Sequence, residues 1–245
     1  MAVSFGEQIH ALTGFDGDSA DASEIGENYD DLTAEWMNIA VREIVNLLPL
    51  NLLERSSKTV SASASYTNGT GVAHDNRILS IVRAKTADFN AGEVFVCRQV
   101  SHQLSHKAAD ENGLSYATET DPVWYYEPQL DGTDIKIKVL PTSSLALSKV
   151  NSIDYPVFDA DGSGNNVNIK TSTSINNFPD EAEYLVVLKA AILAAEYKLN
   201  FEEDIELYIP IIANLKARYE QAILALQTRK LYKPKKKKDK DDDED

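Results

Sequence analysis

The sequence predicts an α+β protein in which a helical core carries an inserted, antiparallel β-rich region. Three observations lead to this class: helical periodicity over residues 32–49, the same periodicity over residues 180–228, and short alternating segments between residues 58 and 175. A helix repeats every 3.6 residues and a strand every two, so the patterns separate the two kinds of element. We therefore expect a body over residues 32–228, with an N-terminal helix and a long C-terminal antiparallel helical hairpin as its core.

The C-terminal hairpin gives the strongest signal. The side chain of Asp180 suits an N-cap, and the nineteen residues from Glu181 to Leu199 contain no Gly or Pro. Apolar residues lie nearly all the way round this helix, which predicts burial on more than one side. After Asn200 a second helix follows, with apolar residues along one face at Ile205, Tyr208, Ile209, Ile212, Leu215, Tyr219, Ile223 and Leu226. Pro210 either kinks this helix or begins it afresh.

The N-terminal helix is predicted over residues 32–49. Its positions recur at helical spacing, at Trp36, Ile39, Ala40, Glu43, Ile44 and Leu47. Asp31 or Thr33 can cap its start, and Pro49 ends it.

Residues 1–31 have a different composition from the helix that follows. They contain eight acidic residues and no Lys or Arg, with Gly and Ser scattered among them. This pattern predicts a flexible acidic arm, or a segment that orders only against a partner. The few apolar residues that could anchor such docking are Val3, Phe5, Ile9, Leu12 and Phe15.

The β-rich insertion is predicted over residues 58–175. Strands are expected at residues 59–66, 78–83, 122–127, 134–140 and 150–158, and turn-forming residues separate them. The segment 134–140 alternates cleanly, with Ile and Val on one face and Lys on the other. Residues 93–108 fit either a helix or a strand followed by a helix, and the spacing of Val96, Val100, Leu104 and Lys107 favours the helix.

Residues 229–245 form a charged tail without the apolar content needed to fold alone. One interpretation is a solvated tail. The other is a basic hook that inserts into an acidic crevice of a partner. The basic residues assigned to this hook are Arg229, Lys230, Lys233, Lys235, Lys236, Lys237 and Lys238.

Composition excludes several classes of protein. The net charge of −15 argues against a general nucleic-acid binder, because such binding depends on Lys and Arg neutralising phosphates. A single cysteine, Cys97, excludes an internal disulfide and a cysteine-based metal cluster. The sequence shows neither a long uncharged apolar run nor a secretion signal, so we expect a soluble protein without a membrane partner.

Residues that could carry chemistry do not form a recognisable catalytic motif. His102 and His106 lie four residues apart, but Gln103 stands where a zinc protease needs Glu. Cys97 lacks a recognisable base. The loop that begins at Asp159 resembles a calcium loop, but Lys170 occupies the position of the bidentate Glu. We therefore expect neither an enzyme nor a cofactor.

Several motifs follow one another in a defined order along residues 30–228. They are a helix ending in Leu48-Pro49, a strand at 78–83, Leu114–Thr118, Asp121–Tyr126, a strand closing at Pro141, and Phe178–Glu183 at the start of the hairpin. This order resembles that of the head–tail connector proteins (adaptor or neck ring proteins) of tailed bacteriophages. The acidic arm and the charged tail depart from the region of resemblance.

The resemblance implies a structural virion protein that joins the capsid portal to the tail. It implies a homo-oligomeric ring, commonly of twelve copies, through which DNA passes without specific binding. The implied partners are the portal protein and the tail or neck proteins, and the implied location is the capsid–tail junction, after assembly in the bacterial cytoplasm. No catalytic, cofactor-binding or metal-binding residue is implied.

Two alternatives remain open. The first is another virion ring or a tail-completion protein. The second, from a different class, is a metal-dependent or thiol enzyme built around His102, His106 and Cys97.

Overall fold

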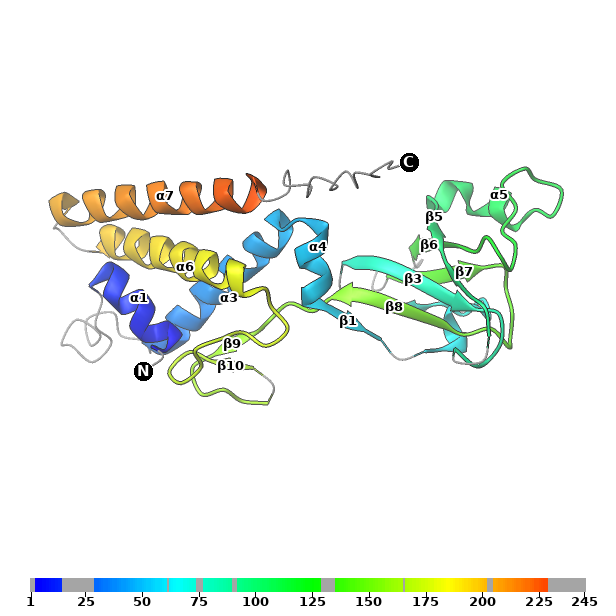
Figure 1. The fold of residues 1–245 in the computed structure, drawn as a ribbon, viewed down its shortest axis with the longest axis horizontal. Helices are drawn as coiled ribbons and strands as arrows, with labels where there is room; N and C mark the ends of the chain where they lie inside the picture. Colours follow the sequence, from blue (N-terminus) through cyan, green and yellow to red (C-terminus); the bar gives the residue numbers. More distant parts are fainter. Residues whose placement is uncertain are drawn as a thin grey trace, which may run out of the picture. The chain divides into compact units, whose positions relative to one another are not determined.

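A computed structural model shows an α+β protein with two compact units (Figure 1). The helical unit comprises Met1–Arg55 and Tyr155–Asp245, and the β unit comprises Ser56–Asp154. The predicted class, a helical core with an inserted β-rich region, is confirmed. The structure describes residues 3–14, 29–60, 62–73, 77–89, 92–128, 135–164, 166–201 and 205–228.

The helical unit contains the predicted N-terminal helix and C-terminal hairpin. Its helices are α1 (Phe5–Thr13), α3 (Tyr29–Leu47), α4 (Leu50–Leu53), α6 (Asp180–Phe201) and α7 (Ile205–Thr228). α6 and α7 run antiparallel (Figure 1). Pro210 lies inside α7 at an exposed position, so this helix neither ends nor begins at the proline.

α6 is covered on several sides, as its apolar composition predicts. It contacts α1, α3 and α7, and Figure 1 shows it between α7 and the pair formed by α1 and α3. The buried apolar residues are Ala182, Leu185, Val186, Val187, Leu188, Ala190, Ala191, Ile192, Ala194 and Ala195. Because small alanines alternate with larger side chains, neighbouring helices can approach this helix closely.

The flexible arm predicted for residues 1–31 is wrong for residues 4–14. Ser4 and Glu7 form a capping box, in which the Glu7 N–H donates to Ser4 Oγ at 3.3 Å and the Ser4 N–H donates to Glu7 Oε2 at 2.8 Å. Phe5 and Ile9 of α1 are buried in the core. Local capping and burial together make this segment a helix despite its acidic surroundings. Residues 15–28 lie outside the described part of the chain.

The inserted unit ends earlier than the predicted boundary at residue 175. Residues 155–175 belong to the helical unit and contain a small parallel pair, β9 (Phe158–Asp159) and β10 (Val167–Asn168). Asn38 of α3 holds the backbone of Phe158 through two hydrogen bonds of 2.8 and 3.0 Å, and the Phe158 ring meets Phe5 edge-on at 5.8 Å. These contacts with distant residues attach the segment to the helices.

The β unit is built from two four-stranded sheets. One has the order β1–β8–β3–β4 and the other the order β2–β7–β6–β5, and every pairing is antiparallel except β5 with β6. The strands are β1 (Ser57–Thr59), β2 (Val72–Ala73), β3 (Ile78–Ala84), β4 (Val94–Val96), β5 (Arg98–Gln99), β6 (Val123–Pro128), β7 (Ile135–Leu140) and β8 (Ser148–Ile153).

Apolar side chains from both sheets form one core. Its buried members are Tyr66, Ile81, Cys97, Trp124, Ile137, Val139 and Val150. Ile137 and Val139 occupy the apolar face predicted for residues 134–140, whereas Lys138 on the other face pairs with Glu127 at 2.6 Å.

The helix favoured for residues 93–108 is wrong over its first half. There β4 runs in one sheet and β5 in the other, and the buried Cys97 lies where the chain changes sheets. Only the second half is helical, as the short 3-10 turn His102–Leu104 and α5 (Ser105–Ala109). Strand pairing over residues 94–99 therefore overrides a local helical spacing.

Replacing Phe5 with Ala tests whether α1 belongs to the folded core. Because Phe5 is 1% exposed, Phe5→Ala should lower the free energy of unfolding by about 3–5 kcal/mol in urea titrations. Val3→Ala is the control, since Val3 is 47% exposed and should change stability by less than about 0.5 kcal/mol. Equal, small effects of both substitutions would mean that α1 detaches in solution.

Candidate functional site

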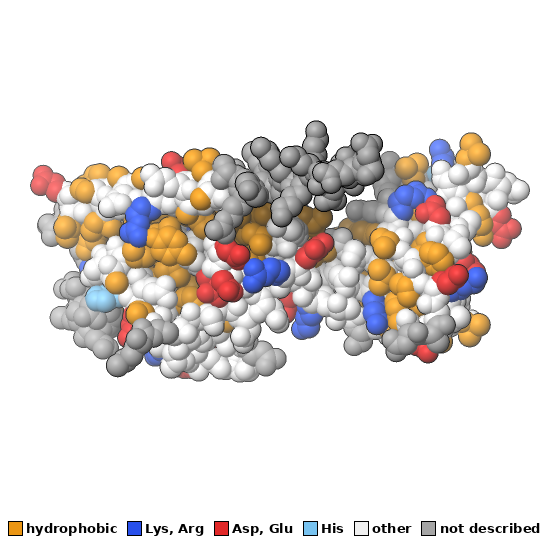
Figure 2. All heavy atoms as spheres, viewed as in Figure 1, with side chains coloured by type: hydrophobic (Ala, Val, Ile, Leu, Met, Phe, Trp, Pro, Cys, Tyr) orange, Lys and Arg blue, Asp and Glu red, His pale blue; other side chains and the backbone are white. Residues whose placement is uncertain are grey.

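α7 exposes apolar residues on both sides of its buried stripe. Tyr208, Ile212 and Leu215 face the core, whereas Ile205, Leu207 and Ile209 are each more than half exposed. At 100° per residue, Ile205 and Ile209 lie on one flank of the buried stripe and Leu207 lies on the other. Figure 2 shows apolar side chains over the face of the helical unit that α7 and α6 form. The first half of α7 thus carries two apolar flanks, named here the Ile209 flank (Ile205, Ile209) and the Leu207 flank.

A shallow apolar groove lies near the other end of α7. It is lined by Ile44, Leu47 and Leu48 from the α3 segment, Leu185 from α6, and Ile223 and Leu226 from α7. The groove is open to solvent and encloses little space of its own. Exposed leucines at Leu47, Leu50 and Leu224 extend the apolar surface of the same three segments and α4. This surface, like the flanks of α7, is suited to contact with another protein.

A polar network holds α7 against α3 and α6. Lys189 of α6 pairs with Glu43 of α3 at 2.8 Å, and the Tyr219 hydroxyl of α7 donates to the same carboxylate at 3.3 Å. Burial, followed by the charge of Glu43, raises the pKa of Tyr219. The phenol therefore stays protonated and able to donate at physiological pH.

Further contacts along the hairpin fix the position of α7. Lys216 pairs with Glu196 at 2.7 Å, and Arg218 donates to the Tyr184 hydroxyl while its guanidinium lies 5.9 Å from the Tyr184 ring centre. Because these contacts reach from the middle of α7 to both halves of α6, α7 presents its flanks in a fixed orientation on α6.

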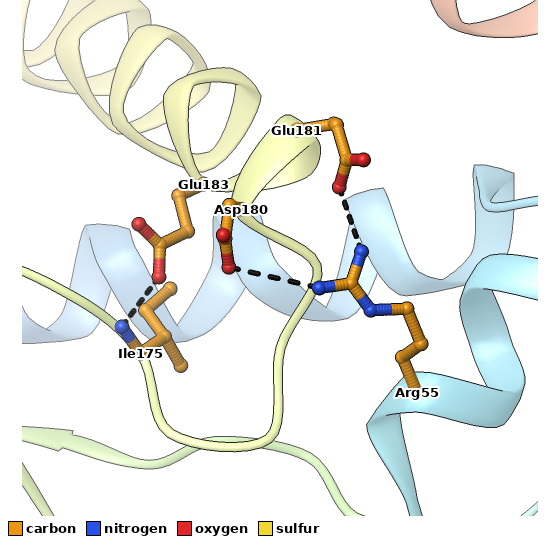
Figure 3. A network of polar contacts seen from close by, with 5 residues as sticks. All are labelled: Arg55, Ile175, Asp180, Glu181 and Glu183. Carbon is orange, nitrogen blue, oxygen red and sulfur yellow. Dashed lines mark hydrogen bonds and ion pairs between the residues drawn. The ribbon is translucent and has the colours of Figure 1, made fainter.

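The start of α6 is fixed by a second network (Figure 3). Arg55 pairs with Glu181 at 2.9 Å and with Asp180 at 3.8 Å. Glu183 turns the other way and accepts a 2.6 Å hydrogen bond from the backbone N–H of Ile175. Burial raises the pKa of Glu183, and this hydrogen bond opposes the shift. Acidic side chains in the first turn also favour the helix through its dipole.

The residues considered for an enzyme do not form a joint site. His102 and His106 are both exposed and lie on different short helices, with the His102 ring 6.0 Å from that of Tyr125. Cys97 is buried, and burial raises the pKa of its thiol to about 12. Within the described ranges, no group of three or more His, Cys, Asp or Glu side chains is arranged to hold a metal ion.

The loop after β9 supplies hydrogen-bond donors to the carboxylate of Asp159. The Asp159 side chain accepts hydrogen bonds from the Ser163 hydroxyl at 2.6 Å and from the Asp161 N–H at 2.8 Å. The hydrogen bond from Ser163 is the main cause that lowers the pKa of Asp159. The Asp159 carboxylate therefore stabilises the turn over residues 159–163.

The tail residues assigned to partner binding, Arg229 to Lys238, lie outside the described residues. In the part of the chain that the structure does describe, no helix is long and apolar enough to cross a membrane.

Comparison with protein-family models and with curated proteins finds no match to this chain.

The reactivity of Cys97 tests the thiol-enzyme alternative. A pKa near 12 leaves very little thiolate at pH 8, since the thiolate fraction falls tenfold per pKa unit. A chromogenic disulfide reagent should therefore react with the native protein at least about 100-fold more slowly than with the urea-unfolded chain. A native rate equal to that of the unfolded chain would show an activated thiol and revive the enzyme interpretation.

Proposed function

We propose that this protein is a structural subunit of a virion ring, the head–tail connector that joins the portal of a tailed-bacteriophage capsid to the tail. The observation that carries the proposal is the pair of apolar flanks on α7. A closed ring needs two different surfaces on each subunit, because each copy contacts its two neighbours through opposite sides. The Leu207 flank and the Ile209 flank lie on opposite sides of one rigidly held helix.

The order of elements supports the same proposal. An N-terminal helix, an inserted β unit and a C-terminal antiparallel hairpin follow one another, as they do in the resemblance drawn from the sequence. The net charge of −15 suits a channel wall that DNA passes without binding. We propose a ring of twelve copies, with the portal and the tail or neck proteins as its partners.

The ring is tested by the mass of the assembled protein in solution. In light scattering and native mass spectrometry, the wild-type chain alone should give a particle of about twelve times the 27.1 kDa chain mass, or should add that mass to its portal when the two are mixed. Leu207→Glu and Ile209→Glu should each leave the melting temperature unchanged and reduce the particle to monomers, because each places a charge on an apolar contact.

Gln221→Glu is the matched control for these variants. It introduces the same charge at an exposed, polar position of α7 and should still assemble. A wild-type chain that stays monomeric in the presence of its portal, or charged variants that assemble like the control, would contradict the proposal.

We also propose that the basic residues of the tail attach the ring to an acidic surface of the portal. The tail follows directly after the end of α7, so this helix fixes the point at which the tail starts. Holding the tail there raises its effective concentration at the partner. The basic residues concerned are Arg229, Lys230, Lys233, Lys235, Lys236, Lys237 and Lys238.

Deleting residues 233–245 should weaken binding to the portal by at least about tenfold without changing the melting temperature. The remaining binding should depend less on salt, because fewer charge contacts are left to screen. Affinity and salt dependence would be measured by titration at several ionic strengths. If both match those of the full chain, the tail is only a solvated extension.

A further inference from the structure

One arginine is buried inside the β unit. Arg83 lies on β3, two residues after the core residue Ile81, and only 1% of its surface is exposed. Because alternate strand residues share a face, its side chain leaves the sheet on the same side as Ile81. A guanidinium remains charged under all ordinary conditions, so a positive charge is enclosed beside an apolar core.

Two nitrogen atoms of the buried guanidinium lack hydrogen-bond partners among the described residues. Among the described residues, Arg83 Nε and Nη1 have no acceptor, although both atoms are shielded from solvent. Most buried charges in proteins are paired, because an unpaired charge is strongly unfavourable in the protein interior. A ligand that accepts hydrogen bonds from these two nitrogen atoms would satisfy the group.

A second unsatisfied group lies directly opposite. Ser148 of β8 is the cross-strand partner of Arg83, so the two side chains project on the same face of the sheet. Ser148 is fully buried, and its Oγ also has no hydrogen-bond partner within the described ranges. Two neighbouring strands thus place two unsatisfied donors side by side.

The carboxylate whose charge acts on Arg83 forms its ion pair with another residue. Glu119 attracts Arg83 electrostatically, but its side chain is more than half exposed and pairs with Lys85 at 3.9 Å. Glu93 pairs with the same lysine at 4.0 Å. Burial lowers the pKa of Arg83, and Cys97 and then Glu119 only partly oppose this shift. Neither carboxylate forms a hydrogen bond with the guanidinium.

We propose that Arg83 and Ser148 form a binding site for a small oxyanion, either a phosphate or a carboxylate group. Oxygen atoms of such an anion accept from the N–H groups along one edge of a guanidinium, and the Ser148 hydroxyl supplies a further donor.

The site is tested by thermal unfolding of the full chain with added anions. Inorganic phosphate or acetate should raise the melting temperature more than chloride at equal ionic strength, because a ligand stabilises the state that binds it. Comparing phosphate with acetate identifies the bound group: stabilisation by phosphate alone indicates a phosphate group, stabilisation by acetate alone indicates a carboxylate group, and equal stabilisation shows that the site accepts either.

Arg83→Met removes the charge and keeps most of the side-chain volume. In chloride buffer this variant should be at least as stable as the wild type, and its apparent affinity for the stabilising anion should fall at least about tenfold. Arg98→Met is the matched control, since Arg98 is exposed and pairs with Asp121 at 3.1 Å in the same unit, and it should keep the full anion response.

Other results would overturn the site. If neither phosphate nor acetate stabilises the wild type more than chloride, or if Arg83→Met keeps the response, no oxyanion binds at Arg83. If Arg83→Met and Glu119→Gln are both destabilised and anions have no specific effect, Glu119 is the partner of the arginine. If Arg83→Met does not fold, Ser148→Ala decides: a weakened anion response supports the site, and an unchanged response contradicts it.

Discussion

The helical unit depends on the need to cover α6. A helix that is apolar on nearly every side cannot face water, and each part of its surface must be buried by a different neighbour. α7 covers one side, α3 a second and α1 a third, so three segments that are far apart in sequence meet on one helix. The ion pairs of Lys189 with Glu43 and of Arg55 with Glu181 then fix these neighbours in register. Hydrophobic burial supplies most of the stability, and the exposed or half-exposed ion pairs mainly set geometry.

Covering α6 does not explain why α7 is apolar on its flanks. Its buried stripe, with Tyr208, Ile212 and Leu215, is sufficient to pack against α6. Leu207 and Ile209 stand outside this stripe and contribute little to the fold of a single chain. Exposed apolar side chains on a helix that is already packed lower solubility unless another surface covers them. The proposed ring, with a neighbour on each side of every subunit, would account for their presence.

The sequence was sufficient to predict the elements whose signal is local. The periodicities of residues 32–49 and 180–228 gave α3, α6 and α7, and the alternation of residues 134–140 gave β7. The predictions were wrong in segments whose secondary structure and burial depend on contacts with residues far away in the sequence. α1 carries a capping box at Ser4 and Glu7, but its burial depends on Phe158 and Ile169, which are more than 150 residues away in sequence. Residues 94–99 became strands because β3 and β6 lie beside them, and no local pattern reveals that pairing.

The candidate site at Arg83 could not be predicted from the sequence for the same reason. In sequence it is one charged residue at the end of an apolar strand, where arginines commonly extend into solvent. Its burial follows from strand order: β3 lies between β8 and β4, so side chains on its core face are enclosed from both sides. The register then sets Ser148 opposite Arg83 and leaves both donors facing the interior. A slip of one residue in this register would turn Arg83 toward the other face of the sheet and remove the pair. The unsatisfied donors are therefore a product of topology, which is why only the three-dimensional structure reveals them.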